Sequence, residues 1–255
     1  MHVVATAGHV DHGKSTLVRA LTGMEPDRWA EEKRRGMTID LGFAWTTLPS
    51  GAELAFVDVP GHERFLPNML AGVGPAPALM FVVAADEGWQ AQSDEHLRIA
   101  DAFGVRHAVV AVTKADRAGA AVVVDDVRRR FAGTALSDTP TVAVSASTGA
   151  GIDELRDALD AMVRSLPTPD IDAPVRMWVD RSFTIRGAGT VVTGTLPAGS
   201  LHDGLELELA PTGRKVVVRG LESLKRQEDK VVGVARVAVN LRGVDRDEVH
   251  RGWRW

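Results

Sequence analysis

The residues best suited to chemistry lie near the start of the chain, in the segment Gly8-His9-Val10-Asp11-His12-Gly13-Lys14-Ser15. It matches G-x-x-x-x-G-K-[ST], follows an apolar run and opens a helical pattern, which is the context of a phosphate-binding P-loop. Backbone N–H groups of such a loop face the phosphates, and the helix N-terminus favours the anion. Lys14 would reach the β- and γ-phosphates, and Ser15 would give a hydroxyl to Mg²⁺. The predicted nucleotide contacts here are Asp11, His12, Gly13, Lys14, Ser15 and Thr16.

A second motif, Asp58-Val59-Pro60-Gly61, follows the apolar run 54–59. An acid at the end of a buried strand can hold the magnesium shell, and a glycine N–H can meet a γ-phosphate. The motif is short and common, so its weight comes from its position after the P-loop. We predict Asp58 and Gly61 as nucleotide-site residues, and Asp58 with Ser15 as metal-site residues.

Two later segments are suited to reading a base. In Thr113-Lys114-Ala115-Asp116, Asp116 can accept two donors from the edge of guanine while Lys114 packs over the ring. The segment Ser145-Ala146-Ser147 ends the next apolar run and is placed for backbone contacts to the base. Ligands of doubly wound sheets bind along the carboxyl ends of the strands, so the four segments are expected to meet at one site. Taken together, they predict GTP rather than ATP.

The elements that would position these loops alternate along the chain. Short apolar runs predict buried strands, and amphipathic spacing between most of them predicts helices. This alternation indicates a mostly parallel, doubly wound sheet, with 41–48 and 53–59 as an antiparallel hairpin at one end. The predicted strands are 2–7, 54–59, 79–84, 108–112 and 141–145, and the predicted helices are 14–23, 92–103, 121–131 and 152–165.

The pattern changes after residue 166. The stretch 167–174 carries three prolines and predicts an extended linker. Beyond it only strand patterns occur, separated by Gly-rich turns, which indicates a small barrel or sandwich. We therefore expect an α/β nucleotide-binding domain over 1–166, a linker over 167–174 and an all-β barrel domain over 175–255.

Composition narrows the classes of protein to which the chain could belong. The chain of 255 residues is 45% apolar and 25% charged, has no cysteine and carries a net charge of −4. The lack of cysteine excludes disulfides and thiolate metal sites, and it fits a cytoplasmic protein. No run of 18 apolar residues and no leader-like N-terminus is present, so no membrane association is expected.

Three runs, AGHVDHGKST, EEKRRGMTIDLGFA and DVPGHERF, resemble translational GTPases of the elongation factor Tu class. The segments EEKRRGMTIDLG, TKAD and DRSFTIRGAGTVVTGT resemble the corresponding motifs of the selenocysteine-specific elongation factors within that class. The resemblance covers residues 1–166 and continues into a second domain that is a β-barrel in the family. It implies GTP-dependent delivery of selenocysteinyl-tRNA to the ribosome, with Mg²⁺ and a monovalent cation at the nucleotide site.

The resemblance also assigns roles to residues of the switch. Thr38 would bind Mg²⁺ and sense the γ-phosphate, and His62 would position the attacking water. Val10 and Ile39 would form an apolar gate beside His62, and Asp11 would help to hold the monovalent cation. Arg35 and Arg64 are expected at the surface rather than as arginine fingers, so hydrolysis is expected to be slow until the ribosome accelerates it.

Thr113 departs from the asparagine that most GTPases place here to tie the base loop to the P-loop. A threonine hydroxyl offers fewer hydrogen-bonding groups than an amide. We therefore expect looser nucleotide binding and exchange without a dedicated factor.

In the second domain, the resemblance maps the aminoacyl pocket onto Asp180, Arg181 and Arg236. A selenol ionises at neutral pH, so its pocket should present positive charge, although a plain strand-edge salt bridge would have the same residues. His202 and His250 are expected in solvated turns. Trp253 and Trp255 are expected to mark a strand that packs on something outside the chain.

Other functions remain open at this point. A different tRNA carrier would share the fold: elongation factor Tu itself or the γ subunit of archaeal-type initiation factor 2. The GTPase subunit of sulfate adenylyltransferase and a non-catalytic GTP-binding remnant are further alternatives. The family reads an mRNA hairpin through C-terminal domains that this sequence does not contain, and we expect the chain to be a monomer.

Overall fold

The computed structural model describes residues 1–26 and 38–255, so part of the EEKRRGMTIDLGFA run, including Arg35, lies outside the described residues. The chain forms two compact units, His2–Leu166 and Pro167–Trp255, and Met1 groups with the second. No helix among the described residues is both long and apolar enough to span a bilayer.

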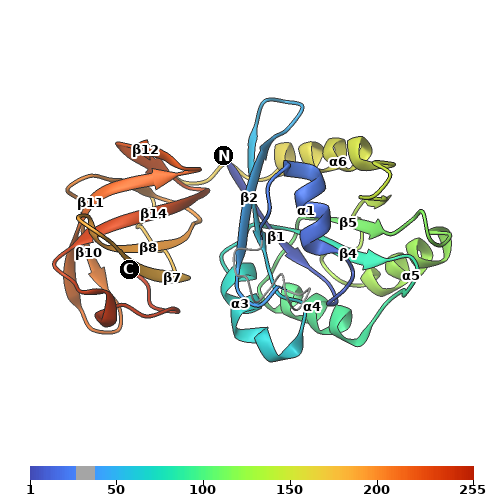
Figure 1. Ribbon diagram of the computed structural model, residues 1–255, viewed down its shortest axis with the longest axis horizontal. Helices are drawn as coiled ribbons and strands as arrows, with labels where there is room; N and C mark the ends of the chain where they lie inside the picture. Colours follow the sequence, from blue (N-terminus) through green and yellow to red (C-terminus); the bar gives the residue numbers. More distant parts are fainter. Residues whose placement is uncertain (27–37) are drawn as a thin grey trace. The chain divides into compact units, whose positions relative to one another are not determined.

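The first unit is built on a six-stranded sheet with the order β2-β3-β1-β4-β5-β6 (Figure 1). Strands β1, β3, β4, β5 and β6 are parallel, and β2 is antiparallel to β3, as the sequence predicts. The central strands are fully buried, which explains why they read as continuous apolar runs. The bounds are β1 His2–Ala7, β2 Gly42–Thr47, β3 Glu53–Asp58, β4 Ala78–Ala84, β5 Ala108–Thr113 and β6 Thr141–Ala143.

Helices cover both faces of this sheet, which confirms the predicted doubly wound α/β class. Helices α1 (Lys14–Thr22) and α6 (Ile152–Ser165) pack on one face, where their apolar residues form a single core with alternate strand residues. Helix α3 (Leu66–Val73) contacts β1 and β3, and α4 (Ala91–Ala102) also contacts β1. Helix α5 (Ala121–Phe131) completes the set.

The sequence analysis did not predict α3 or the 3-10 turn η1 (Glu63–Phe65) before it. Helix α3 has eight residues, with a proline in its first turn and Gly72 near its end. A helix this short shows little periodicity, and Gly72 is required for packing because a Cβ there would lie 2.6 Å from Val59 Cγ1. Gly72 therefore allows α3 to pack closely against the sheet.

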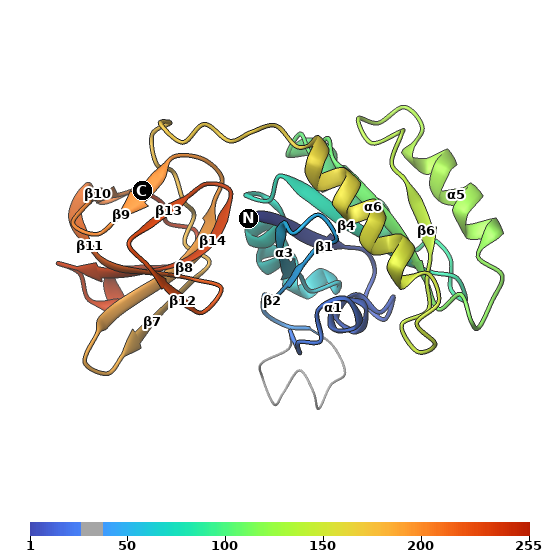
Figure 2. The same ribbon diagram turned by 90° about the horizontal axis from the view of Figure 1, so that it is seen from above.

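The second unit is all β, as expected, and its described residues contain no α-helix (Figure 2). One sheet has the order β10-β11-β14-β8-β7 with β12 paired to β11, and β9 pairs with β13. The bounds are β7 Arg181–Ile185, β8 Gly189–Leu196, β9 Ser200–His202, β10 Glu206–Leu209, β11 Arg214–Ser223, β12 Arg226–Glu228, β13 Lys230–Val232 and β14 Ala235–Arg242, followed by the 3-10 turn η2 Arg246–Glu248.

Two details of this unit differ from what its sequence suggests. The run 231–241 has a continuous strand-like pattern, but it is divided between β13 and β14, which pair with different strands. Trp255, expected to pack on something outside the chain, instead lies in this unit's own core at 7% exposure. The backbone there is fixed because Met177 N donates to Trp255 O and Val179 N donates to Trp253 O.

Candidate functional site

The four predicted loops lie at one edge of the first unit's sheet. The P-loop follows β1, Asp58 ends β3, Thr113 ends β5, and the Ser145 segment follows β6. Parallel strands bring their carboxyl ends to the same edge, so segments far apart in sequence become neighbours.

Backbone geometry makes the P-loop a cradle. Gly8 has a φ of 128°, and a Cβ there would lie 2.1 Å from Val82 O of β4. Gly13 has a φ of 82° at the N-cap of α1, and Asp11 also has a positive φ of 65°. Glycine adopts such angles at little cost. The first turn of α1 therefore presents its N–H groups at a loop that an anion can approach, which fits a phosphate.

Lys14 places its charge inside this loop. Its Nζ donates to Gly8 O at 3.0 Å and to His9 O at 2.8 Å, and the residue is buried. Gly61 lies against the same place, since a Cβ on it would be 2.4 Å from Lys14 Nζ and 2.5 Å from Val10 N. The loop after β3 therefore meets the P-loop at the ammonium group of Lys14.

Of the three residues predicted to serve a metal, two form a close pair and the third is a buried acid at the end of β3. Ser15 Oγ and Thr38 Oγ1 are 2.7 Å apart and share a hydrogen bond. Asp58 is fully buried, and its Oδ1 accepts from Thr6 Oγ1 at 2.8 Å. Hydroxyl and carboxylate oxygens are hard ligands that suit Mg²⁺, which usually takes one or two carboxylates together with phosphate oxygens and waters. The donor set fits that ion.

His62 directly follows Gly61 and is the N-cap residue of η1. Its Nδ1 accepts from Arg64 N at 3.1 Å, and the ring is half-buried beside Phe65 at a centroid distance of 6.0 Å. Val10 and Ile39, the predicted apolar gate, are half-buried as well. Asn68 of α3, which the sequence analysis did not single out, donates from Nδ2 to Ile39 O at 2.8 Å.

The base-reading loops are linked to the P-loop. Thr113 Oγ1 donates to His12 O at 2.7 Å, so the threonine keeps one tie between the two loops. Asp116 Oδ2 accepts from Ser147 Oγ at 3.2 Å, and Ser145 Oγ lies 3.0 Å from Ser147 Oγ. Hydrogen bonding, first from Ser145, lowers the pKa of Asp116, so its exposed carboxylate is ionised and can accept donors. Ala146 lies between the two serines and is half-buried.

Helix α4 supports the P-loop from residues that no sequence motif indicated. Gly8 N donates to His96 Nδ1 at 2.8 Å, and Val10 N lies 3.4 Å from Gln92 Oε1. Burial lowers the pKa of His96 to about 3, with a smaller effect of Lys14, so the ring is neutral and can accept this bond. Burial likewise lowers the pKa of His12 to about 4.

In the second unit, Asp180 and Arg236 form a buried ion pair. Arg236 Nη1 binds Asp180 Oδ2 and also donates to Thr195 Oγ1 at 3.1 Å. Thr193 Oγ1 donates to Asp180 Oδ1 at 2.6 Å. The charge of Arg236 is thus paired within the unit.

Arg181 is arranged differently from Arg236. It lines a cavity of about 220 Å³ together with Arg246, Arg251 and His250 and with the acids Asp180 and Asp247, of which Asp247 pairs with Arg246 at 2.7 Å. Arg251 Nε donates to the backbone oxygen of Asp180 at 2.6 Å. The structure therefore brings Asp180 and Arg236 into one pair and sets Arg181 in a hollow beside it, which is lined by both arginines and aspartates. His202 and His250 are exposed, as expected, but His202 is the last residue of β9 and not a turn residue.

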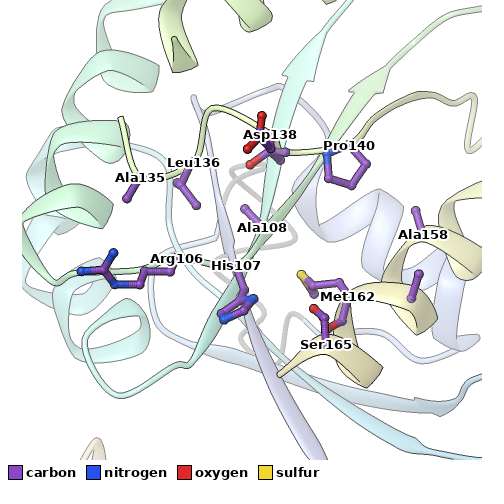
Figure 3. Close-up of a pocket in the computed structure, with 12 residues that line it drawn as sticks. Arg106, His107, Ala108, Ala135, Leu136, Asp138, Pro140, Ala158, Met162 and Ser165 are labelled. Atoms are coloured by element: carbon purple, nitrogen blue, oxygen red, sulfur yellow. The ribbon is translucent and has the colours of Figure 1, made fainter. Parts of the chain in front are cut away.

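Another cavity, of about 410 Å³, lies at the opposite edge of the first unit's sheet (Figure 3). His107 and Ala108 lie at the start of β5, and Met162 and Ser165 of α6 face them. None of the predicted site residues lines it.

Comparisons with known proteins agree with this geometry. The family model for the elongation factor Tu GTP binding domain matches residues 1–165, and the model for elongation factor Tu domain 2 matches residues 189–253. A selenocysteine-specific elongation factor of Desulfomicrobium baculatum is 44% identical over 98% of this chain, and one of Escherichia coli is 41% identical over 98%. The chain spans 40% and 41% of the length of these relatives.

Solved structures show the same likeness. A crystal structure of a bacterial selenocysteine-specific elongation factor, EF-Sec, superposes with a TM-score of 0.91 at 37% identity, covering 100% of this chain and 44% of that one. Translation elongation factor SelB of Methanococcus maripaludis, in complex with the GTP analogue GppNHp, gives 0.88 at 29% identity, covering 99% and 54%. These matches confirm the resemblance to selenocysteine-specific elongation factors, and the chain belongs to the elongation factor Tu GTP binding domain family.

Proposed function

We propose that this chain is a guanine-nucleotide switch that binds GTP and GDP with Mg²⁺ and hydrolyses GTP. The observation that carries the proposal is the hydrogen bond from Thr113 Oγ1 to His12 O at 2.7 Å, which joins the base-reading loop to the phosphate loop. One ligand that has both a base and phosphates can then contact both loops. The match of the GTP binding domain model over residues 1–165 supports the same assignment.

Each residue of the site takes a role that its position allows. Lys14 and the N–H groups of Gly13, Lys14, Ser15 and Thr16 would hold the phosphates, and Asp116 would accept the donors of guanine while Lys114 covers the ring. Ser15, Thr38 and Asp58 would hold Mg²⁺, which neutralises charge on the transferred phosphoryl group when bound. Asp11 would help to hold a monovalent cation.

We propose His62 as the residue that orients the attacking water. It follows Gly61, which lies against Lys14 Nζ and therefore beside the expected place of the γ-phosphate. The Nδ1 of His62 accepts from Arg64 N, which leaves Nε2 as the atom to contact water. Hydrolysis would be slow without a partner, and release of the γ-phosphate would free the loops of Thr38 and Gly61.

The proposed biological role is delivery of selenocysteinyl-tRNA to the ribosome at recoded UGA codons, by a cytoplasmic monomer. Curated relatives at 40–44% identity are named selenocysteine-specific elongation factors, which favours this role over a general tRNA carrier or the sulfate adenylyltransferase subunit. The aminoacyl pocket would be formed by Asp180, Arg181 and Arg236. Arg181, in a cavity that it shares with Arg251 and with the acids Asp180 and Asp247, would attract a selenolate.

Protection of the aminoacyl ester tests this role. The rate of spontaneous hydrolysis of selenocysteinyl-tRNA and seryl-tRNA is measured with the protein and a non-hydrolysable GTP analogue. We expect protection of the selenocysteinyl ester alone, reduced by about tenfold in Arg181→Gln because one cation is lost. Arg186→Gln, at an exposed position of the same unit, is the control. Equal protection of both esters would contradict the proposed specificity.

A further inference from the structure

The loop between β4 and α4, residues 85–90, carries a cluster of polar and aromatic contacts that the proposed function has not used. It includes the acids Asp86 and Glu87 and the aromatic residue Trp89. All three make contacts with other segments of the first unit, and two of those segments belong to the nucleotide site.

The acids hold the lysine of the base-reading loop. Lys114 Nζ is 2.5 Å from Glu87 Oε1 and 3.3 Å from Asp86 Oδ1. Lys114 has a positive φ of 55°, an uncommon conformation for a residue with a side chain. Burial alone would lower the pKa of Lys114, but its hydrogen bonds to the carboxylates of Glu87 and Asp86 outweigh burial and raise the pKa. The ammonium group is therefore charged and held on one side by carboxylates.

Aromatic packing fixes the loop that carries these acids. The Trp89 ring is stacked on Phe81 with an interplanar angle of 1° and a centroid distance of 5.4 Å, and it meets the edge of Phe131. Arg130 lies 5.1 Å above the Trp89 ring, and Trp89 Nε1 donates to Asp94 Oδ1 at 2.8 Å. Trp89, two residues after Glu87, thus anchors the loop on β4, α4 and α5.

Glu87 also approaches the P-loop. Its Oε2 lies 3.9 Å from His12 Nε2, and His12 O accepts the hydrogen bond of Thr113. Glu87 therefore lies where the phosphate-binding loop, the base-reading loop and the anchored 85–90 loop come together. Asp86 is a less specific partner of Lys114 than Glu87 is, because Asp86 Oδ2 also lies 3.6 Å from Arg117 Nη1.

We propose that Glu87 is a positioning residue for guanine-nucleotide binding, which sets the direction of the Lys114 side chain along the base. The inference rests on the proposed function. With Glu87 in place, the Lys114 ammonium group is already held by a carboxylate before the nucleotide arrives, so less side-chain freedom is lost on binding. Thr113 ties the base loop to the P-loop through its hydrogen bond to His12 O, and the contact of Glu87 with Lys114 supplies a further constraint on the base loop.

Equilibrium and dissociation measurements with fluorescent GDP and GTP, in the full chain with Mg²⁺, test this. Glu87→Gln should raise both dissociation constants by about tenfold, as expected for a partly exposed charge-assisted hydrogen bond. The ratio of GTP to GDP affinity should stay unchanged, because the base loop does not sense the γ-phosphate. Asp86→Asn should have a smaller effect, and Glu95→Gln on α4 serves as the charge-matched control.

A double-mutant cycle separates positioning from a general structural role. In a Lys114→Met background, Glu87→Gln should change affinity by less than about twofold, because its partner is gone. A full tenfold effect in that background, or equal effects of Glu87→Gln and Glu95→Gln, would overturn the inference. Failure of the wild-type chain to bind guanine nucleotides would instead overturn the proposed function and the inference together.

Discussion

Single residues determine how closely the loops of the nucleotide site approach one another. Gly8 and Gly61 lie where any side chain would strike backbone atoms, of β4 in one case and of the P-loop in the other. His96 reaches the P-loop from α4 and accepts the Gly8 N–H. These contacts are short-range and local, so their effects can be tested by single substitutions.

Gly61→Ala should separate the loop after β3 from the P-loop. The added Cβ would lie 2.5 Å from Val10 N, a backbone atom that cannot turn away as a side chain can. We expect GTP hydrolysis to fall by at least about tenfold and stability by about 1–3 kcal/mol, the cost of forcing atoms into a packed site. Single-turnover hydrolysis and urea unfolding measure the two effects. Gly119→Ala, where a Cβ meets open space, should change neither.

His96 should make stability depend on pH. Its folded-state pKa of about 3 lies below the usual value of 6.5, so the unfolded chain binds the proton first as the pH falls. Stability from this residue is present above pH 6.5 and is lost progressively as the pH falls toward 3, by about 3 kcal/mol at pH 4. In His96→Asn, whose amide oxygen can accept from Gly8 N but does not titrate, this loss should be absent. Identical pH profiles for both proteins in urea unfolding would contradict the account.

At the scale of elements, the parallel sheet explains why sequence reasoning located the nucleotide loops. Each of the four motifs follows an apolar run, and the carboxyl ends of parallel strands meet at one edge. The supporting contacts were not predicted, because they join residues far apart in sequence with no motif between them. Gly8 and His96 are separated by 88 positions, and Ile39 and Asn68 by 29. Helix α3, which carries Asn68, was itself too short to give a clear periodic pattern.

Helix α3 should couple the segment of Thr38 to the segment of Gly61. Asn68 Nδ2 donates to Ile39 O, next to the hydroxyl pair of Thr38 and Ser15. Asn68→Asp removes this donor with little change in volume, so the preference for a GTP analogue over GDP should fall by about threefold to tenfold. Competition binding with both nucleotides measures the preference. Gln227→Glu, at an exposed amide, should leave it unchanged; an unaltered preference in Asn68→Asp would show that the bond does not couple the two segments.

At the scale of the whole molecule, the two units have separate apolar cores and separate chemistry. One core lies beneath α1 and α6, and the other fills the β unit. All predicted nucleotide contacts belong to the first unit, while the ion pair of Asp180 and Arg236 belongs to the second. The all-β class of the second unit could be predicted from its turns, but the pairing of β9 with β13 could not, since both strands have three residues.

A fragment of residues 1–166 should therefore retain guanine-nucleotide binding. Every contact that we assign to the nucleotide is made within this range, so the dissociation constant for GDP should stay within about threefold of the full chain. Calorimetric titration of both proteins compares them. A folded fragment that binds GDP more than about thirtyfold more weakly would show that the β unit contributes to the site.

Equilibrium binding of fluorescent GTP and GDP with Mg²⁺, in the presence of competing ATP and in a Lys14→Ala variant, tests the central claim most directly. We predict binding that excess GTP displaces and ATP does not, together with loss of affinity in the variant, because Lys14 Nζ lies inside the phosphate loop. Equal displacement by ATP and GTP would contradict the guanine-reading role of Asp116. Unchanged affinity in Lys14→Ala would contradict the assignment of the P-loop as the phosphate site.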